Sequence, residues 1–369
     1  MDSAKEQTEV NYRIYADEKE QLPNAAVSQY QAGICRRSLL LLGLGGAILA
    51  CVVIGLLWGN RQLPAGELLW AFLTHNTTSL AGTYVWRIDL PIITAAVLVG
   101  AGLSLSGVVM QCLLRNPLAS PYTLGLSSAA SFGAALSVIL FNGGAVFAHG
   151  FLQAYCTPIC AFACALLATG LVLALTKLTR VAPETMVLAG IAISAIFTAG
   201  LTLLQYLADP VQMSAIVSWT FGSVSYTSWS WDLVLFAVLV PATAYFLYRC
   251  WDLNAVSAGD EVARGLGVNT NRLLVIGMML SALLASVMVA RFGVIAFVGL
   301  LGPHLARLLV GNDYRLLVPG GMLTGALLMI VANTLALNIV RPMILPVGLL
   351  TSLLGGPAFI YLLLRRYRR

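Results

Sequence analysis

The sequence has 369 residues, of which 59% are hydrophobic and only 10% are charged, and its formal net charge is +6. Soluble domains are about half apolar and about a quarter charged, so a soluble multidomain protein is excluded. Most of the chain must therefore use lipid as its solvent. The positive charge follows the expected membrane topology, described below, and needs no nucleic acid to explain it.

Residues 1–37 precede the first apolar run, and residues 1–33 of this segment are polar, rich in charge and poor in large apolar side chains. Such a composition is typical of a disordered tail. It argues against a cleaved signal peptide, whose charged leader should be short. We expect a solvated tail over residues 1–37, followed by one membrane domain over residues 38–369.

Ten apolar runs follow, most of them close to the roughly 20 residues that an α-helix needs to cross a bilayer. Small residues are dense within them, as in VGAGLSLSG (99–107), which favours closely packed helices. The sequence therefore predicts an all-α polytopic membrane protein with about ten transmembrane helices. The expected spans are residues 38–58, 91–114, 123–141, 154–178, 185–207, 231–250, 273–291, 293–310, 316–337 and 344–364.

Lysine and arginine are concentrated in alternate connections between these spans, and this asymmetry predicts orientation. With the N-terminus inside, the outside connections hold only Arg61, Arg87, Arg291 and Arg341. An even number of spans then places both termini in the cytoplasm. The inside connections hold Arg36, Arg37, Arg115, Lys177, Arg180, Arg249, Arg264, Arg272, Arg315 and the terminal RRYRR (365–369).

Patterns of catalysis and metal binding are scarce. No lysine lies in a G-x-x-x-x-G-K-[ST] loop, and H-E-x-x-H is absent. Ser104 in GLSLSG resembles a nucleophile, but no base is placed for it, so helix packing is favoured. A stripe of Cys156, Cys160 and Cys164 on one helix face could hold a metal, but small buried side chains are favoured. We predict no catalytic residue, metal site or cofactor.

Ionisable residues inside membrane spans usually mark transport paths, and here they are nearly absent. The exceptions are His304 and Arg307, close to an expected helix kink at Pro303. The alternative to a transport role is that His304 and Arg307 form a structural pair near that kink. An ion-coupled carrier needs titratable groups at the midplane, so this scarcity favours transport driven by an external source of energy.

The stretch LNAVSAGDEVARGLGVNTNRLL (253–274) is polar and lies in an expected cytoplasmic connection over residues 251–272. Ser257 with Asp260 suggests an N-cap for a short helix that runs through Arg264. GLG (265–267) should end this helix, and Asn269 should cap the next one.

This short helix has two faces of interest. Val262 and Leu266, four residues apart, give it an apolar face. Gly259 and Ala263 are small, so the backbone of a partner could approach closely. The pattern predicts a helical element that docks on another protein. The alternative is a cytoplasmic loop that packs only on its own bundle.

The same stretch resembles the coupling loop of permease subunits in the iron–siderophore and cobalamin family of ABC importers. Other motifs match that family in the same order, and the match covers nearly everything after residue 38. They are VGAGLSLSGVVMQCLLRNPLASPYTLGLSSAASFGA (99–134), APETMVLAGIAIS (182–194), SWTFGSVSYTSW (218–229), GVIAFVGLLGPHLARLLVGNDYRLLVPGGMLTGALLMIVANTLA (293–336) and LPVGLLTSLLGGPAFIYLLLRR (345–366).

The resemblance implies a type II ABC importer permease architecture. It also implies a homodimer, or a paired permease, with two ATPase subunits below it and a substrate-binding protein outside. The coupling loop would use Ser257, Gly259, Asp260, Glu261, Ala263, Arg264, Gly265, Leu266 and Gly267. The remaining motif positions, expected in the translocation path or its structural support, are Arg115, Asn116, Pro117, Gly222, Ser223, Pro303, His304 and Arg307.

The outer docking residues of the family are only partly present. The family's R-L-P-R pattern is replaced by WRIDLPIIT (86–94), with Asp89 and Ile92 at the two arginine positions, which leaves Arg87. The family's A-D-x-x-A-R pattern is replaced by ANTLAL (332–337), which leaves Arg341 nearby. Asn333 and Leu337 stand at its acidic and arginine positions, and Ile344 stands where the family often has an acidic residue before LPVG. Arg87 and Arg341 are therefore the predicted docking residues, with interfacial anchoring as the alternative.

Two function classes follow. The resemblance implies the membrane subunit of an ATP-driven importer of an iron(III)-siderophore or similar ferric chelate, with haem and cobalamin as variants, and no nucleotide site of its own. The alternative is a self-sufficient secondary transporter or channel. The polar stretch and the scarcity of midplane charges favour the importer.

Overall fold

A computed structural model describes residues 33–58, 63–75, 77–141, 151–178, 183–225, 227–340 and 342–367. Nearly all of the predicted tail, residues 1–37, lies outside these ranges. The chain divides into two units, Met1–Gly43 and Leu44–Arg369. The described part of the first unit is the start of the helix Gly33–Leu57, and all features discussed below belong to the second unit.

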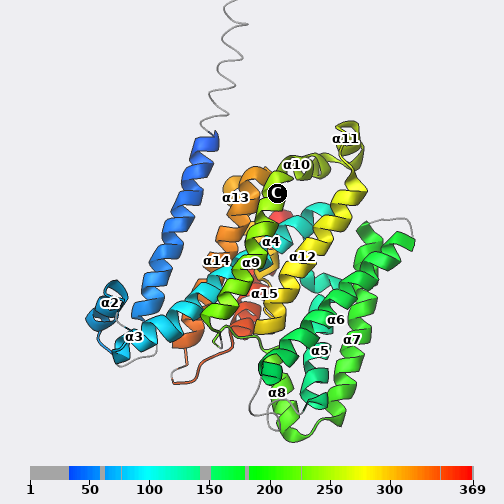
Figure 1. The fold of residues 1–369 in the computed structure, drawn as a ribbon. Coiled ribbons are helices and arrows are strands. Elements are labelled where there is room, and N and C mark those ends of the chain that lie inside the picture. The colour runs from blue at the N-terminus through cyan, green and yellow to red at the C-terminus, as the bar shows by residue number, and fades with distance from the viewer. Residues whose placement is uncertain are drawn as a thin grey trace, which may run out of the picture. The chain divides into compact units, whose positions relative to one another are not determined.

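The described residues are almost entirely helical, and they contain no strand (Figure 1). Within these residues, seven helices are long and apolar enough to cross a membrane, and three shorter ones are also apolar. After the helix Gly33–Leu57, the elements are α2 (Ala65–Leu73), α3 (Leu80–Tyr84), η1 (Val85–Asp89), α4 (Leu90–Leu113), η2 (Pro121–Leu124), α5 (Leu126–Leu140), α6 (Phe151–Leu178), α7 (Pro183–Leu207), α8 (Pro210–Thr220), α9 (Trp229–Tyr248), α10 (Cys250–Ala258), α11 (Asp260–Gly265), α12 (Thr270–Phe292), α13 (Val298–Val310), α14 (Tyr314–Asn338) and α15 (Val347–Tyr367).

The predicted all-α membrane fold is confirmed, because an apolar helix lies in each of the ten predicted runs. The eighth run begins later than expected. Helix α13 starts at Val298 and not near residue 293, because Gly293 and Phe297 both adopt positive φ angles, of 74° and 65°. A residue in that conformation cannot continue a right-handed helix. The two short helices α2 and α8 were not expected, since nine and eleven residues are too few for a span.

The second predicted span also begins elsewhere. The helix runs without a break from Leu80 to Leu113 through the π-helical turn η1, although residue 91 was the expected start. Pro91 lacks a backbone N–H, and inside an α-helix its ring would clash with the carbonyl four residues earlier. The wider π turn lies just before this proline, and π turns are a known way for a helix to absorb such a disruption. Proline therefore marks an irregularity in this helix and not its beginning.

Helix α4 forms the centre of the bundle, and nearly all of its residues are buried. It packs on α9, α12, α13 and α14. The closest approach is to α14, where a Cβ atom added to Gly100 would lie 2.3 Å from the carbonyl oxygen of Gly325. Small residues therefore bring the backbones of these two helices together, as the sequence predicted.

Buried hydroxyl groups join α4 to its neighbours. Ser104 Oγ donates a hydrogen bond to the carbonyl of Gly321 on α14, at 2.5 Å, and Ser106 Oγ donates to Ser281 on α12, at 2.8 Å. Thr324 Oγ1 of α14 donates to Gly302 on α13, at 2.8 Å. Ser104 has no exposed area. Its hydroxyl has the helix-packing role that the sequence favoured over a nucleophile.

The connections collect at two ends of the bundle. At one end, Arg115 forms an ion pair with Asp260, and Asn254 contacts Asp313, so three connections meet there. At the opposite end, Ser223 N–H donates to Phe292 at 2.8 Å, and Gly348 N–H donates to Gly222 at 3.0 Å. We call the first the α10–α11 end. This grouping follows the alternation of connections that the sequence predicted.

Candidate functional site

The polar stretch forms two short helices, α10 and α11, at one end of the bundle (Figure 1). Only Arg249 separates the end of α9 from the start of α10. The buried side chains Leu253 and Val256 of α10 hold this helix on the bundle. Cys112 Sγ of α4 donates a weak hydrogen bond to the carbonyl of Leu253, at 3.4 Å. The element is thus an elbow that rests on the bundle, not a free loop.

The bend between the two helices differs from the predicted N-cap. Ser257 lies inside the last turn of α10, where its hydroxyl donates to the carbonyl of Asn254 at 2.7 Å. The residue before α11 is Gly259, at φ 138°, a region that favours glycine. The predicted Ser257 cap is therefore wrong. A serine can bond to its own helix as readily as to the next one, and the glycine conformation decides where the chain turns.

The end of α11 is as predicted. Gly267 adopts φ 82°, and its N–H donates to the carbonyl of Arg264 at 2.9 Å, while Val268 N–H donates to Ala263 at 2.9 Å. This pair of bonds is a Schellman motif, which satisfies the last carbonyls of the helix. Asn269 then caps α12 by accepting from Arg272 N–H at 3.0 Å.

Burial separates the two predicted faces of α11. Ala263 has no exposed area, so it cannot touch a partner protein, and the predicted small-residue contact face is wrong at this position. Val262 and Leu266, in contrast, are 49% and 70% exposed. The alanine is small because α11 packs closely on its own bundle, whereas the apolar face is the one that points outward.

Charge also positions α11. Asp260, in its first turn, forms an ion pair with Arg115 from the connection after α4. A carboxylate at a helix N-terminus is favourable because of the helix dipole. Arg115 has a positive φ of 47°, and Asn116 Oδ1 next to it accepts from Leu118 N–H at 2.9 Å, which forms a tight turn. Of the other predicted coupling residues, Glu261, Arg264 and Gly265 are exposed on α11.

A hollow of about 490 Å³ lies beside the elbow. It brings together five of the predicted residues from three separate motifs: Arg115, Pro117, Ser257, His304 and Arg307. The buried Gln111 of α4 accepts a hydrogen bond from Arg307 Nη1 at 2.6 Å. His304 and Arg307 therefore line this hollow near the α10–α11 end, next to the connection that follows α4.

A second hollow, of about 560 Å³, lies along α7. Three hydroxyl side chains on α7, Ser194, Thr198 and Thr202, line it at intervals of four residues, together with Tyr122 of η2. Ser194 Oγ also shares a hydrogen bond with Ser128 of α5, at 2.8 Å. Isoleucine and alanine side chains of α7 complete this wall, so it mixes hydroxyl and apolar groups and carries no charge. The sequence analysis did not identify it.

At the opposite end, Gly222 and Ser223 join three elements. Gly222, at φ 67°, accepts from Gly348 N–H at the start of α15, and Ser223 N–H donates to the end of α12. A Cβ atom on Gly222 would lie 2.3 Å from the carbonyl oxygen of Val294. These two residues therefore hold a junction, and glycine is required there by both its conformation and the close approach.

Only one of the two predicted docking residues lies within the part of the chain that the structure describes. Arg87 is exposed on η1, whereas Arg341 lies outside the described residues. Asp89, Ile92 and Asn333, which replace charged residues of the family pattern, are all buried, at 8%, 8% and 3% exposure. Leu337 is partly buried, and Ile344 is exposed.

The cysteine stripe on α6 packs against α5. A Cβ atom added to Gly133 of α5 would lie 2.4 Å from the carbonyl oxygen of Cys160 and 2.9 Å from Cys164 Sγ. Ser137 of α5 and Thr157 of α6 share a hydrogen bond of 3.2 Å in the same interface. Cys160 and Cys164 therefore lie where the two helices approach each other, although all three cysteines are only partly buried and not fully buried as the sequence predicted.

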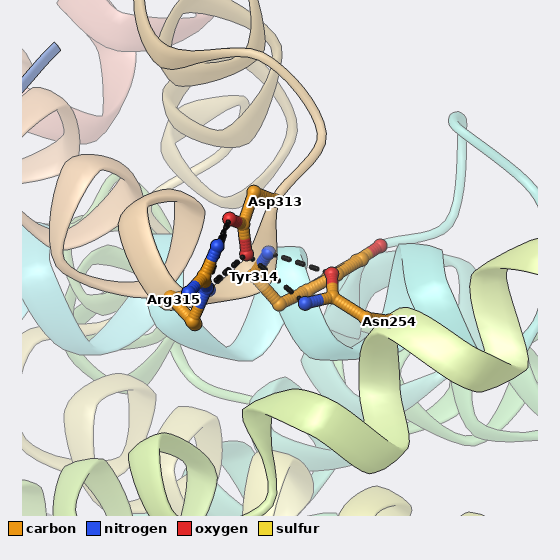
Figure 2. A network of polar contacts seen from close by, with 4 residues as sticks. All are labelled: Asn254, Asp313, Tyr314 and Arg315. Atoms are coloured by element: carbon orange, nitrogen blue, oxygen red, sulfur yellow. Dashed lines mark hydrogen bonds and ion pairs between the residues drawn. The ribbon is translucent and has the colours of Figure 1, made fainter. Parts of the chain in front are cut away.

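The sequence analysis missed the contacts that hold the elbow on the bundle (Figure 2). Asn254 binds Asp313, and Arg315 binds the same carboxylate. Asn254 Nδ2 donates to Asp313 Oδ1 at 3.0 Å, and Asn254 Oδ1 accepts from Tyr314 N–H at 2.9 Å. About 60 residues separate the partners in the chain. No local pattern could indicate such a contact.

Comparison with known proteins agrees with this architecture. The model of the FecCD transport family matches residues 47–365. The chain is 45% identical over 314 residues to the ABC transporter permease protein MJ0087 of Methanocaldococcus jannaschii, which covers 84% of this chain and 90% of that protein. It is 39% identical over 324 residues to the hemin transport system permease protein HmuU of Yersinia pestis, covering 88% and 95% of the two chains.

A solved structure of a metal-chelate type ABC transporter, in an inward-facing conformation, superimposes with a TM-score of 0.77 at 30% identity. The superposition covers 89% of this chain and 99% of the other. The family match, the relatives and the helical bundle all agree. The chain belongs to the FecCD transport family, and it is a multi-pass membrane permease component of the ABC importer class.

Proposed function

We propose that the chain is the membrane-spanning subunit of an ATP-driven importer and that it binds a separate ATPase through the elbow α10–α11. The observation that carries this proposal is the exposed apolar pair Val262 and Leu266 on a helix whose base is fixed to the bundle. Exposed apolar side chains on a short helix are typical of a docking element. A rigid base is needed because a flexible loop would absorb the motion of the ATPase.

The proposed substrate is an iron(III)-siderophore or a similar ferric chelate, with haem and cobalamin as variants. The relatives support this class, since one is named for hemin transport and a similar structure for metal chelates. The hydroxyl-lined hollow along α7 is a suitable wall for such a path. Hydroxyl groups can exchange hydrogen bonds with a polar chelate, and an uncharged wall does not trap it.

The proposed assembly contains two copies of this chain, or a paired permease, in the inner membrane. Two ATPase subunits bind at the α10–α11 end, which we assign to the cytoplasm together with both termini. A substrate-binding protein docks outside. This assignment is supported by the arginines of that end, Arg115, Arg249, Arg264, Arg272 and Arg315.

The test is uptake by cells that lack this chain, measured separately with ferric siderophores, haem and cobalamin. We expect the uptake of one class to be lost and to return when the gene is restored. The purified chain alone should show no ATPase activity above background. If the chain alone, in vesicles without an ATPase, transports the chelate when an ion gradient is applied, it is a secondary transporter and the proposal fails.

Of the two predicted docking residues, Arg87 lies within the residues that the structure describes. We propose that it binds a carboxylate of the substrate-binding protein. We expect Arg87→Glu to slow association of the binding protein by about tenfold at low salt, because rim charges act mainly on the association rate. The difference should shrink at high salt, as screening removes it. Arg87→Lys, which keeps the charge, is the control. Equal association rates for Glu and Lys at low salt would leave Arg87 as an interfacial anchor.

A further inference from the structure

The elbow has an attachment to the bundle that is remote in sequence. Helix α10 follows α9 and, through α11, precedes α12, so either neighbour could receive its motion. The side chain of Asn254 instead joins α10 to the first turn of α14 (Figure 2). We call the group of Asn254, Asp313, Tyr314 and Arg315 the α10–α14 clasp.

Asn254 uses both ends of its amide in the clasp. Its Nδ2 donates to the Asp313 carboxylate at 3.0 Å, while its Oδ1 accepts from the backbone N–H of Tyr314 at 2.9 Å. The first N–H groups of a helix have no partner within that helix. Asp313 satisfies the N–H of Arg315 at 3.1 Å, and Asn254 satisfies that of Tyr314. Helix α10 therefore supplies part of the N-terminal cap of α14.

Arg315 fixes the carboxylate that Asn254 holds. Its Nε donates to Asp313 Oδ2 at 2.9 Å and its Nη2 at 2.6 Å, and its guanidinium also lies 4.5 Å from the ring centroid of Trp251 on α10. The bonds from Arg315 lower the pKa of Asp313 to about 2, and the bond from Asn254 contributes less. The carboxylate is thus ionised at neutral pH, and its bonds are charge-assisted.

Separation of α10 from α14 would leave the Tyr314 N–H without its partner and would remove one of the bonds that Asp313 Oδ1 accepts, at a partly buried position. Helix α14 is in turn fixed to the core, through Ser104 with Gly321 and through Thr324 with Gly302. In contrast, the route to α12 passes through Gly267, a glycine at φ 82° that ends α11. The clasp is therefore a stiff connection between the elbow and the centre of the bundle.

We infer that the α10–α14 clasp transmits the displacement of the elbow to α14, and that Asn254 is the positioning residue of this transmission. This inference rests on the proposed coupling role of the elbow. It adds that the motion enters the bundle through α14 and its contacts with α4 and α13. Binding of the ATPase and transmission of its motion then depend on different residues.

The first test replaces Asn254 by Leu, which keeps the approximate volume and removes both bonds. We expect the assembled complex to retain the ATPase and its basal hydrolysis, while transport per ATP hydrolysed falls by about tenfold or more. The matched control is Asn271→Leu, at an exposed position of α12 at the same end of the bundle. Unchanged transport per ATP in an assembled Asn254→Leu complex would overturn the inference.

The second test exchanges the amide and the carboxylate of the clasp, and it remains decisive if Asn254→Leu does not fold. Asn254→Asp alone places a second carboxylate against Asp313, so coupling should be lost. The reciprocal pair Asn254→Asp with Asp313→Asn restores one amide and one carboxylate, and the carboxylate introduced on α10 can still accept from Tyr314 N–H. Coupling should return in the pair. A double variant as uncoupled as the single one would contradict the inference.

A third measurement separates this inference from the proposed function. Hydrogen exchange of the Tyr314 amide, measured on the permease without any ATPase, should be faster in Asn254→Leu and unchanged in Asn271→Leu. If exchange responds but the unsubstituted chain binds no ATPase, the proposed function fails and the clasp stands as a structural contact only. If exchange does not respond, the clasp itself is refuted, whatever the function of the chain.

Discussion

The double substitution Val262→Asp with Leu266→Asp is expected to weaken binding of the ATPase subunit by at least about a hundredfold and to abolish uptake. About half of Val262 and most of Leu266 are exposed on α11, at 49% and 70%, so we expect the permease to fold with both substitutions. A partner that buries this apolar face would have to bury two carboxylates without counterions, which costs several kcal/mol. The measurement is co-purification of the ATPase with tagged permease, together with uptake in cells.

The matched control for this experiment is Asn271→Asp, which adds negative charge at an exposed position of α12 at the same end of the bundle. It should leave ATPase binding within about twofold, because it lies outside the apolar face. Thermal stability of the permease should be the same in both variants. Full ATPase binding and full uptake in the double variant would refute the docking role of α11.

Substitution of Ala263 by Trp is expected to act on the permease itself and not on the partner. Ala263 has no exposed area, so a large side chain cannot be placed without displacing α11. Overpacking of this kind costs about 1–3 kcal/mol and often more for so large a change. We expect a lower yield of monodisperse permease and a lower thermal midpoint in detergent, with loss of uptake as a consequence.

The control for Ala263→Trp is Gly265→Ala, in the same helix. A Cβ atom there meets nothing within 4 Å, and alanine is a better helix former by about 1 kcal/mol. Its thermal midpoint should be equal or slightly higher. A stable Ala263→Trp permease that has lost only ATPase binding would mean that Ala263 faces the partner, contrary to its burial in this structure.

Much of the fold was determined by the sequence alone, because lipid leaves few options. Unpaired backbone groups are too costly in a bilayer, so each long apolar run must be a helix. The helix boundaries were less predictable. The π turn before Pro91 and the nonhelical residues 293–297 arise where a proline or a positive φ conflicts with regular geometry, and hydropathy does not register either.

In the candidate site, the sequence predicted what depends on residues close together in the chain. These local features are the end of α11 at Gly267, the cap of α12 at Asn269, and the apolar pair Val262 and Leu266. The Ser257 cap was wrong because the Ser257 hydroxyl bonds within α10, and the chain turns at Gly259, which is the residue before α11.

Only the tertiary structure decided which faces are covered and which distant residues meet. The small face of α11 looked like a contact surface, but Ala263 is buried by its own bundle, so its size reflects internal packing. The contact of Asn254 with Asp313, which links residues 59 positions apart, depends on how α10 crosses the start of α14. Burial and long-range pairing are properties of the packed chain, because each depends on atoms that the local sequence does not contain.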